Sequence, residues 1–141
     1  MRIEVTEDAP AEIAGTEVRA YCDLHRHVSS IKPMTGKRKG YVVAKPRRLV
    51  LKDVRFEISQ AGLRRCRAEK VRNVHAYARG EVAGSNVDAV KNHPDAVRIR
   101  YNPHLFDNFV RGDTQQAIAG VAFLAIEGKT AWGLGIVALS A

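Results

Sequence analysis

Cysteine is scarce in this chain of 141 residues: only Cys22 and Cys66 occur, far apart in the sequence. A disulfide framework is therefore not expected, and the sequence predicts a reduced, intracellular protein with both thiols in the core. The segment Met1–Val5 lacks the apolar stretch of a secretory signal and the basic amphipathic pattern of a transit peptide. We therefore expect the cytoplasm as its location.

Long apolar runs are also missing. The two most apolar segments, 117–126 and 131–139, are divided by the charged turn 127–130, and neither reaches the roughly 18 residues that a membrane helix needs. They predict a β-hairpin, with Phe123 and Trp132 in the core or at a subunit interface, and no membrane partner. Because this hairpin is more apolar than one domain of this size needs, we expect a homo-oligomer, most simply a twofold dimer.

The sequence shows no recognisable catalytic signature, no paired carboxylates near its basic region and no dinucleotide fingerprint. Gly36-Lys37 lacks the upstream glycine and the following Ser or Thr of a phosphate loop. Cys22, His25 and His27 offer three metal ligands at most, without the second pair of a structural zinc site. We therefore predict a protein that is not an enzyme, with no metal and no cofactor. His75 is the best single catalytic candidate, but a ligand-contacting or core imidazole is the favoured interpretation.

Acidic residues are rare in the middle of the chain. Between Lys37 and Arg79 the only carboxylates are Asp53, Glu57 and Glu69, and the whole chain has a formal net charge of +8. A solubilising surface would explain a run of lysines, but most of these cations are arginines, whose planar fork suits phosphate and can stack on a base. The charge pattern therefore favours an anionic partner such as nucleic acid, nucleotide, phosphate or acidic protein.

The length of 141 residues and the hydrophobic content of 45% predict a single domain over residues 1–141, and the hydrophobic periodicity predicts an α+β fold. The expected architecture is a mainly antiparallel sheet with one Arg-rich helix, from about Gln60 to Arg72, packed against it. We expect Ser29–Gly40 to be an exposed basic loop, Lys45–Arg48 to be a hairpin or bulged edge, and residues 80–95 to be a surface connection. The expected strands are Arg2–Thr6, Val18–Leu24, Tyr41–Ala44, Leu49–Leu51, Val54–Ile58, Val74–Arg79 and Val97–Tyr101.

Two of these strands carry the candidate binding residues. His75, Tyr77 and Arg79 alternate onto one face of the first strand, and Arg98 and Arg100 onto one face of the second. If the two strands are neighbours in one sheet, these side chains share a face and form a basic pocket that a neighbouring subunit could complete. The predicted ligand-binding residues are Tyr77, Arg98, Arg100 and His104, helped by Arg64, Arg65, Asn73 and His75.

Four segments carry a resemblance to a known family: Asp23-Leu24-His25, VLKDVRFEISQAGLRR (50–65), VRNVHAYARG (71–80) and IRYNPHLFDNFV (99–110). Across roughly residues 21–110 the chain resembles a family of small phage and prophage proteins that includes the Thoeris anti-defence proteins of the first type. The resemblance implies sequestration of cyclic ADP-ribose isomers, the alarm signals of bacterial TIR-domain enzymes. The adenine would stack on Tyr77 or an Arg plane, and Arg100 and its neighbours would bind the pyrophosphate.

The sequence thus leads to two functional hypotheses of different class. The first is a non-enzymatic sponge for an anionic cyclic nucleotide that counters a bacterial anti-phage defence, acting in the host cytoplasm if phage-encoded. The second is a small basic nucleic-acid-binding protein, whose affinity should fall steeply with salt. A nuclease or phosphodiesterase is a distant third, because it would require metal-binding carboxylates that the acid-poor middle does not offer.

Overall fold

Strands make up most of the computed structural model, which describes residues 3–23, 28–58, 64, 68, 76–100 and 109–139. The short helical elements are the 3-10 helix η1 (Ala11–Ile13) and the α-helix α2 (Val87–Lys91). The strands are β1 (Val5–Asp8), β2 (Glu17–Asp23), β3 (Val28–Pro33), β4 (Lys45–Ile58), β5 (Ala76–Gly84), β6 (Val97–Arg100), β7 (Val110–Arg111), β8 (Ile118–Glu127), β9 (Thr130–Leu134) and β10 (Val137–Ala138).

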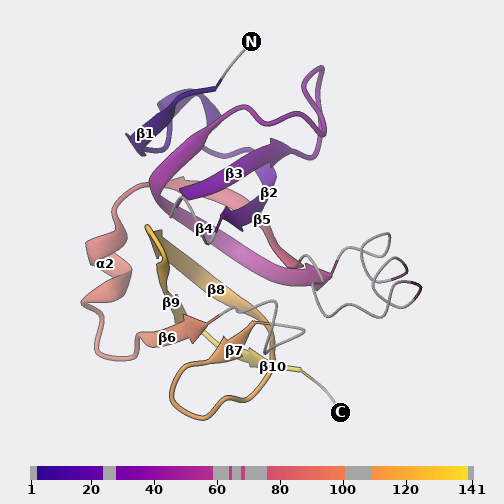
Figure 1. Cartoon of the computed structure of the whole chain (residues 1–141). Coiled ribbons are helices and arrows are strands. Elements are labelled where there is room, and N and C mark those ends of the chain that lie inside the picture. Colours follow the sequence, from indigo (N-terminus) through magenta and orange to yellow (C-terminus); the bar gives the residue numbers. More distant parts are fainter. Residues whose placement is uncertain are drawn as a thin grey trace.

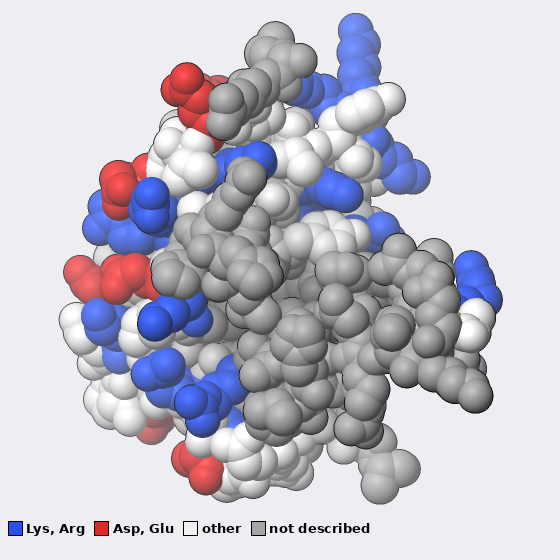
Figure 2. Space-filling model, in the orientation of Figure 1, with Lys and Arg blue, Asp and Glu red and all other residues white. Residues whose placement is uncertain are grey.

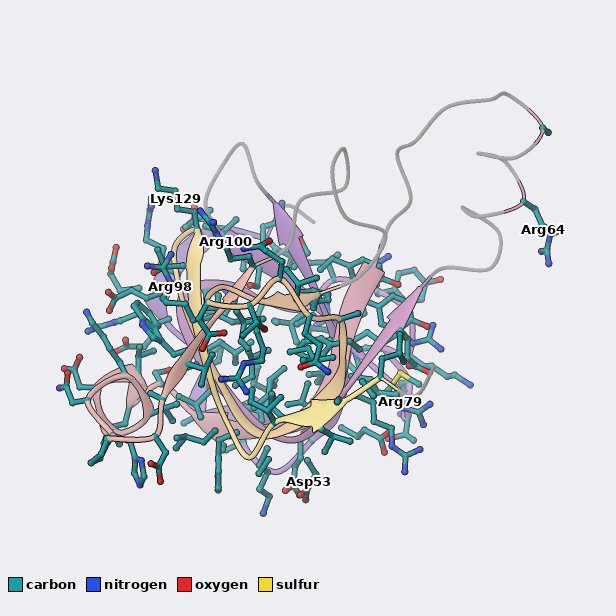
Figure 3. The ribbon with its side chains drawn as sticks, turned by 90° about the horizontal axis from the view of Figure 1, so that it is seen from below. Asp53, Arg64, Arg79, Arg98, Arg100 and Lys129 are labelled. Atoms are coloured by element: carbon teal, nitrogen blue, oxygen red, sulfur yellow. The ribbon has the colours of Figure 1, made fainter. Side chains whose placement is uncertain are left out.

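The protein is all-β, so the prediction of an α+β fold with an Arg-rich helix packed on the sheet is wrong. Of the predicted helix Gln60–Arg72, the structure describes only Arg64 and Ala68. Both are helical but exposed, and Arg64 projects far from the strands (Figure 3). The physical reason is that the sheet covers its own apolar face by curling, so a packed helix is not needed to complete the core.

All ten strands belong to one sheet, which curls back on itself at both ends. The strand order is β3-β2-β5-β4-β8-β9-β6-β7, with β1 added to β4 and β10 added to β8. Isolated bridges join Ile31 to Ala44, just before β4, and Val110 to Ala117, just before β8. The terminal strands β3 and β7 therefore contact the segments that lead into the central strands β4 and β8. Figure 1 shows β1–β5 above and β6–β10 below, with β4 lying along β8 between them.

Strand β4 is the central element of the sheet. It pairs with β5 on one edge and with β8 on the other, which places it in both halves. The predicted hairpin or bulged edge at Lys45–Arg48 is wrong, because Pro46 lies inside β4, opposite Thr6 of β1. The strand does carry a bulge later, at Asp53, whose φ of 54° accompanies a register shift between Lys52 and Arg55.

Two further segments differ from the sequence-based expectation. Residues 29–33, expected as part of an exposed loop, belong to β3, with Ser29 and Ile31 buried. Residues 80–95, expected as a surface connection, contain the end of β5 and the helix α2. Gly80 lies inside β5, where a Cβ would come within 2.9 Å of the Lys52 carbonyl oxygen. This glycine therefore permits close packing between two strands, although glycine in a sequence usually indicates a turn.

The predicted alternation of several strands is confirmed. Val54 in β4 and Ile99 in β6 are buried, whereas their sequence neighbours Arg55 and Arg98 are exposed. The C-terminal hairpin is confirmed as well, since β8 and β9 pair antiparallel around a turn at Gly128. The fully buried side chains of the core come from both halves of the sheet: Val18, Ile31, Leu49, Leu51, Val82, Ile118 and Leu124. No helix in the described ranges is long and apolar enough to cross a membrane.

Candidate functional site

Cations surround a single indole on the outward side of β6 and β9. Arg98 stands directly opposite Trp132 in the register of the two strands, with its guanidinium carbon 5.5 Å from the ring centroid. The ammonium nitrogen of Lys91, at the end of α2, lies 5.0 Å from the same centroid. Both distances are in the range of a cation–π interaction. We call this surface the tryptophan patch, and it consists of Lys91, Arg98, Arg100, Lys129 and Trp132.

The tryptophan patch arises from strand alternation and from the position of α2. In β6, Ile99 points into the core, so Arg98 and Arg100 point outward from the same strand. Trp132 packs against a small apolar cluster that includes Val87 and Val90 of α2. The helix therefore supports the indole from one side and leaves it half-buried among the cations.

Much of the charge of the tryptophan patch is not neutralised. Arg98, Arg100 and Lys129 are exposed, and no carboxylate in the described part of the chain forms a salt bridge with them. Lys91 lies 3.6 Å from Glu127. Figure 3 shows Arg98, Arg100 and Lys129 gathered on one side of the molecule, and Figure 2 shows several Lys and Arg residues on the left, where α2, β6 and β9 lie, with Asp and Glu residues among them. The patch is therefore a local site of positive potential.

An open cleft of about 420 Å³ adjoins the patch, lined in part by Arg98, Arg100, Gly112 and Asp113. The N–H of Gly112 donates to the carbonyl of Arg98 at 2.7 Å, and a Cβ at Gly112 would lie 3.0 Å from the Arg98 Cβ. Asp113 is held by two hydrogen bonds from Arg111, of 2.9 and 3.0 Å, which keep the pKa of its carboxyl below the ordinary value. The acid on the cleft wall is thus engaged by Arg111, and Arg98 and Arg100 remain available.

A second cation–aromatic surface lies on the outward side of β3, β2, β5 and β4. Arg19 covers the ring of Tyr77 at 4.9 Å, Lys32 covers the ring of Tyr21 at 4.8 Å, and the two rings are 5.1 Å apart. We call this surface the tyrosine face, and it consists of Arg19, Tyr21, Lys32, Arg55, Glu57, Tyr77 and Arg79.

Tyr77 and Arg79 have contrasting environments on the tyrosine face. Tyr77 is only 7% exposed, and burial, together with the nearby Glu57 carboxylate, raises the pKa of its phenol above the ordinary value. Arg79 donates from Nε to Glu17 at 2.6 Å and lies 3.9 Å from Glu57. A base could not stack freely on the Tyr77 ring, because Arg19 already covers it.

The structure brings together some of the sequence-predicted site residues and separates others. Arg98 and Arg100 lie side by side on β6, as expected. Tyr77 lies on β5, and the strand order places β4, β8 and β9 between β5 and β6. The two candidate strands are therefore not neighbours, and Figure 3 shows Arg79 of β5 and the Arg98–Arg100 pair on opposite sides. Arg64 lies away from both.

Four predicted site residues lie outside the described residues: Arg65, Asn73, His75 and His104. The same holds for the side chains of the discounted metal set, Cys22, His25 and His27. Among the residues that are described, no group of three His, Cys, Asp or Glu side chains gathers in a way that could hold a metal ion.

Sequence reasoning missed several residues of both surfaces. Lys129 was read as part of a turn, and Trp132 was expected in the core or at an interface, so neither was placed beside Arg98. Arg19 is not among the predicted site residues, and Lys32 is expected only as one of the cations of the basic loop Ser29–Gly40, which could act as a flap over a site. The available signal was their outward position in an alternating strand, but which strands lie side by side is set by long-range pairing that periodicity does not report.

The fold and the two surfaces define a small basic all-β protein whose cations are arranged around aromatic rings. A family model described as Mycobacterium phage L5 gene 82 protein matches residues 12–133. The chain therefore belongs to this phage protein family. Membership confirms the phage part of the resemblance found in the sequence, whereas the link to Thoeris anti-defence stays a prediction. No curated protein and no solved structure matches the chain.

Proposed function

We propose that this phage-family protein binds a small anionic nucleotide at the tryptophan patch and holds it without chemical change. The observation that carries the proposal is the cluster of Arg98, Arg100 and Lys129, three exposed cations without a carboxylate partner in the described part of the chain, beside Trp132 and a cleft of about 420 Å³. Ligand-binding clefts generally measure about 300–1,000 Å³, so a nucleotide fits this one in size.

The chemistry of the patch suits both parts of a nucleotide. Arg98 and Arg100 project from alternate positions of one strand, about 7 Å apart along it, a spacing that two guanidinium groups can use to hold a pyrophosphate. A nucleobase can stack on the outward side of the Arg98 guanidinium plane, because the indole itself is already flanked by Lys91 and Arg98. This replaces Tyr77 in the stacking role that the sequence suggested, because Tyr77 is buried on another strand.

The biological role that we propose is sequestration. The ligand class that we propose, a cyclic ADP-ribose isomer used as a signal in bacterial anti-phage defence, rests on the motif resemblance; membership in a phage family supports only the phage context. A sponge of this kind would act in the host bacterial cytoplasm and would not be an enzyme. We further propose that it works as a homo-oligomer, with a neighbouring copy completing the cleft.

The first prediction concerns Arg100. Calorimetric titration of the full chain with cyclic ADP-ribose and with ADP-ribose, as defined probes, should give binding to at least one of them. Arg100→Ala should weaken that binding by about 1.5–3 kcal/mol, because a charge-assisted contact to phosphate is lost. Arg100 is exposed, so the melting temperature should stay close to that of the wild type.

The matched control is Arg38→Ala, which removes the same charge from the exposed loop between β3 and β4. It should leave the affinity for the probe unchanged. The proposal would be contradicted if neither probe binds the wild type. Equal weakening by both substitutions would also contradict it, because the effect would then reflect net charge and not the tryptophan patch.

A further inference from the structure

Four cations stand in register across four neighbouring strands of the tyrosine face. Arg19 of β2 pairs directly with Lys32 of β3 and with Arg79 of β5, and Arg79 pairs with Arg55 of β4. Neighbouring strands are about 4.8 Å apart, so this row is about 14 Å long. Like charges directly opposite each other destabilise a sheet. The row therefore weakens the fold unless an anionic partner offsets the repulsion.

Carboxylates on and beside the tyrosine face compensate only part of this charge. Glu17 and Glu57 both engage Arg79, at 2.6 and 3.9 Å. The other three cations of the row form no salt bridge with any carboxylate of the described segments. Positive charge without a salt-bridge partner in the described segments thus remains at both ends of the row, at Lys32 and Arg55, and at Arg19 between them.

The tyrosines hold two of these cations in place. The guanidinium of Arg19 lies on the ring of Tyr77, and the ammonium of Lys32 lies on the ring of Tyr21. Each contact restrains a long side chain before any ligand arrives, which reduces the conformational entropy lost on binding. The rings themselves pack at 5.1 Å, so the two cations are fixed relative to each other.

The basic surface continues beyond the row. The loop that follows β3 carries Lys37, Arg38 and Lys39, all exposed, and residues 28–44 contain no Asp or Glu. This loop extends at the upper right in Figure 1, and basic side chains project there in Figure 2. A ligand that follows the row past β3 would therefore meet further positive charge.

We propose that the tyrosine face binds single-stranded nucleic acid through its phosphates. A row of about 14 Å exceeds a single pyrophosphate, and its four cations can contact successive phosphates of one extended strand, as the basic grooves of sheet-based single-strand binders do. Proteins that read duplex DNA insert a helix or a two-stranded ribbon into a groove, whereas this row lies flat across four strands. The inference does not depend on the proposed nucleotide site, which lies on another side of the molecule.

The test is fluorescence anisotropy of the full chain with a labelled 16-nucleotide thymidine oligomer, over a series of salt concentrations. Lys32→Ala combined with Arg55→Ala should weaken binding at least tenfold and make the slope of log affinity against log salt shallower by about 1.4, since each phosphate contact contributes about 0.7 on single strands. The matched control is Lys91→Ala with Lys129→Ala, which removes the same charge from the tryptophan patch and should change binding less than threefold.

Three outcomes would overturn the inference: no binding of the oligomer by the wild type, equal weakening by both double variants, or tighter binding of a duplex of the same length. Titration with cyclic ADP-ribose separates this inference from the proposed function. The Lys32 and Arg55 double variant should keep the affinity for that probe, and Arg100→Ala should keep the affinity for the oligomer.

Discussion

At the residue scale, contacts between cations and aromatic rings organise both surfaces. Arg19 and Lys32 lie on tyrosine rings, whereas Lys91 and Arg98 lie near the single tryptophan. A long basic side chain has about 2 kcal/mol of rotamer entropy in solution, and an aromatic neighbour removes part of it in advance. The rings therefore act on ligand binding indirectly, by holding charge in a fixed place.

Tyr77 provides a prediction about pH. Burial and the Glu57 carboxylate raise its pKa above the ordinary value near 10, so the folded state favours the neutral phenol. Its contribution to stability is thus complete below pH of about 10 and is lost as the pH rises through the higher folded-state pKa. In a spectrophotometric titration one tyrosine should ionise at a higher pH than an ordinary phenol does.

Tyr77→Phe should abolish this ionisation step at higher pH. The control Tyr41→Phe, which removes an exposed phenol, should leave the step unchanged. Persistence of the step in Tyr77→Phe would refute the assignment.

At the element scale, local alternation was predictable and strand pairing was not. The outward positions of Arg98 and Arg100 follow from period two, because Val97 and Ile99 must turn toward the core. The strand order that separates β5 from β6 depends on contacts between residues far apart in sequence. The continuity of β4 through Pro46 was hidden for the same reason, since its parallel partner β1 lies some forty residues earlier.

Gly120 in β8 gives a prediction about this pairing. A Cβ at this position would overlap the carbonyl oxygen of Val54 in β4, so the glycine permits the close approach of the two strands. Gly120→Ala should lower the free energy of unfolding by about 1–3 kcal/mol, through overpacking. Urea denaturation measures this change.

The control is Ala83→Ser, at an exposed position of β5, which should change the free energy of unfolding by less than about 0.5 kcal/mol. A Gly120→Ala protein as stable as the wild type would show that the strands can move apart.

At the scale of the whole molecule, the C-terminal half leaves apolar surface uncovered. Phe123, Val137 and Leu139 are 41%, 56% and 48% exposed. A groove of about 550 Å³ between β4 and the C-terminal strands is lined in part by Val54, Phe56 and Val137. We propose that a second copy covers this surface, because pairing would remove it from water.

Light scattering coupled to size exclusion tests the assembly. The wild type should elute as a dimer or a larger symmetric oligomer at micromolar concentration. Val137→Lys should shift it toward the monomer, because burying a charge in an apolar interface is unfavourable. Lys37→Ala, in the exposed loop after β3, should leave the assembly unchanged. A wild type that is monomeric under these conditions would contradict the proposal.

The measurement that tests the central claim most directly is capture of the proposed ligand. Purified protein is incubated with the filtrate of a TIR-enzyme reaction, freed of excess nucleotide, denatured by heat and analysed by mass spectrometry of the released small molecules. We expect recovery of an unaltered cyclic ADP-ribose isomer from the wild type and a strong reduction with Arg98→Ala and Arg100→Ala combined. Release of a cleaved product would show an enzyme, and recovery of no nucleotide would contradict the proposed function.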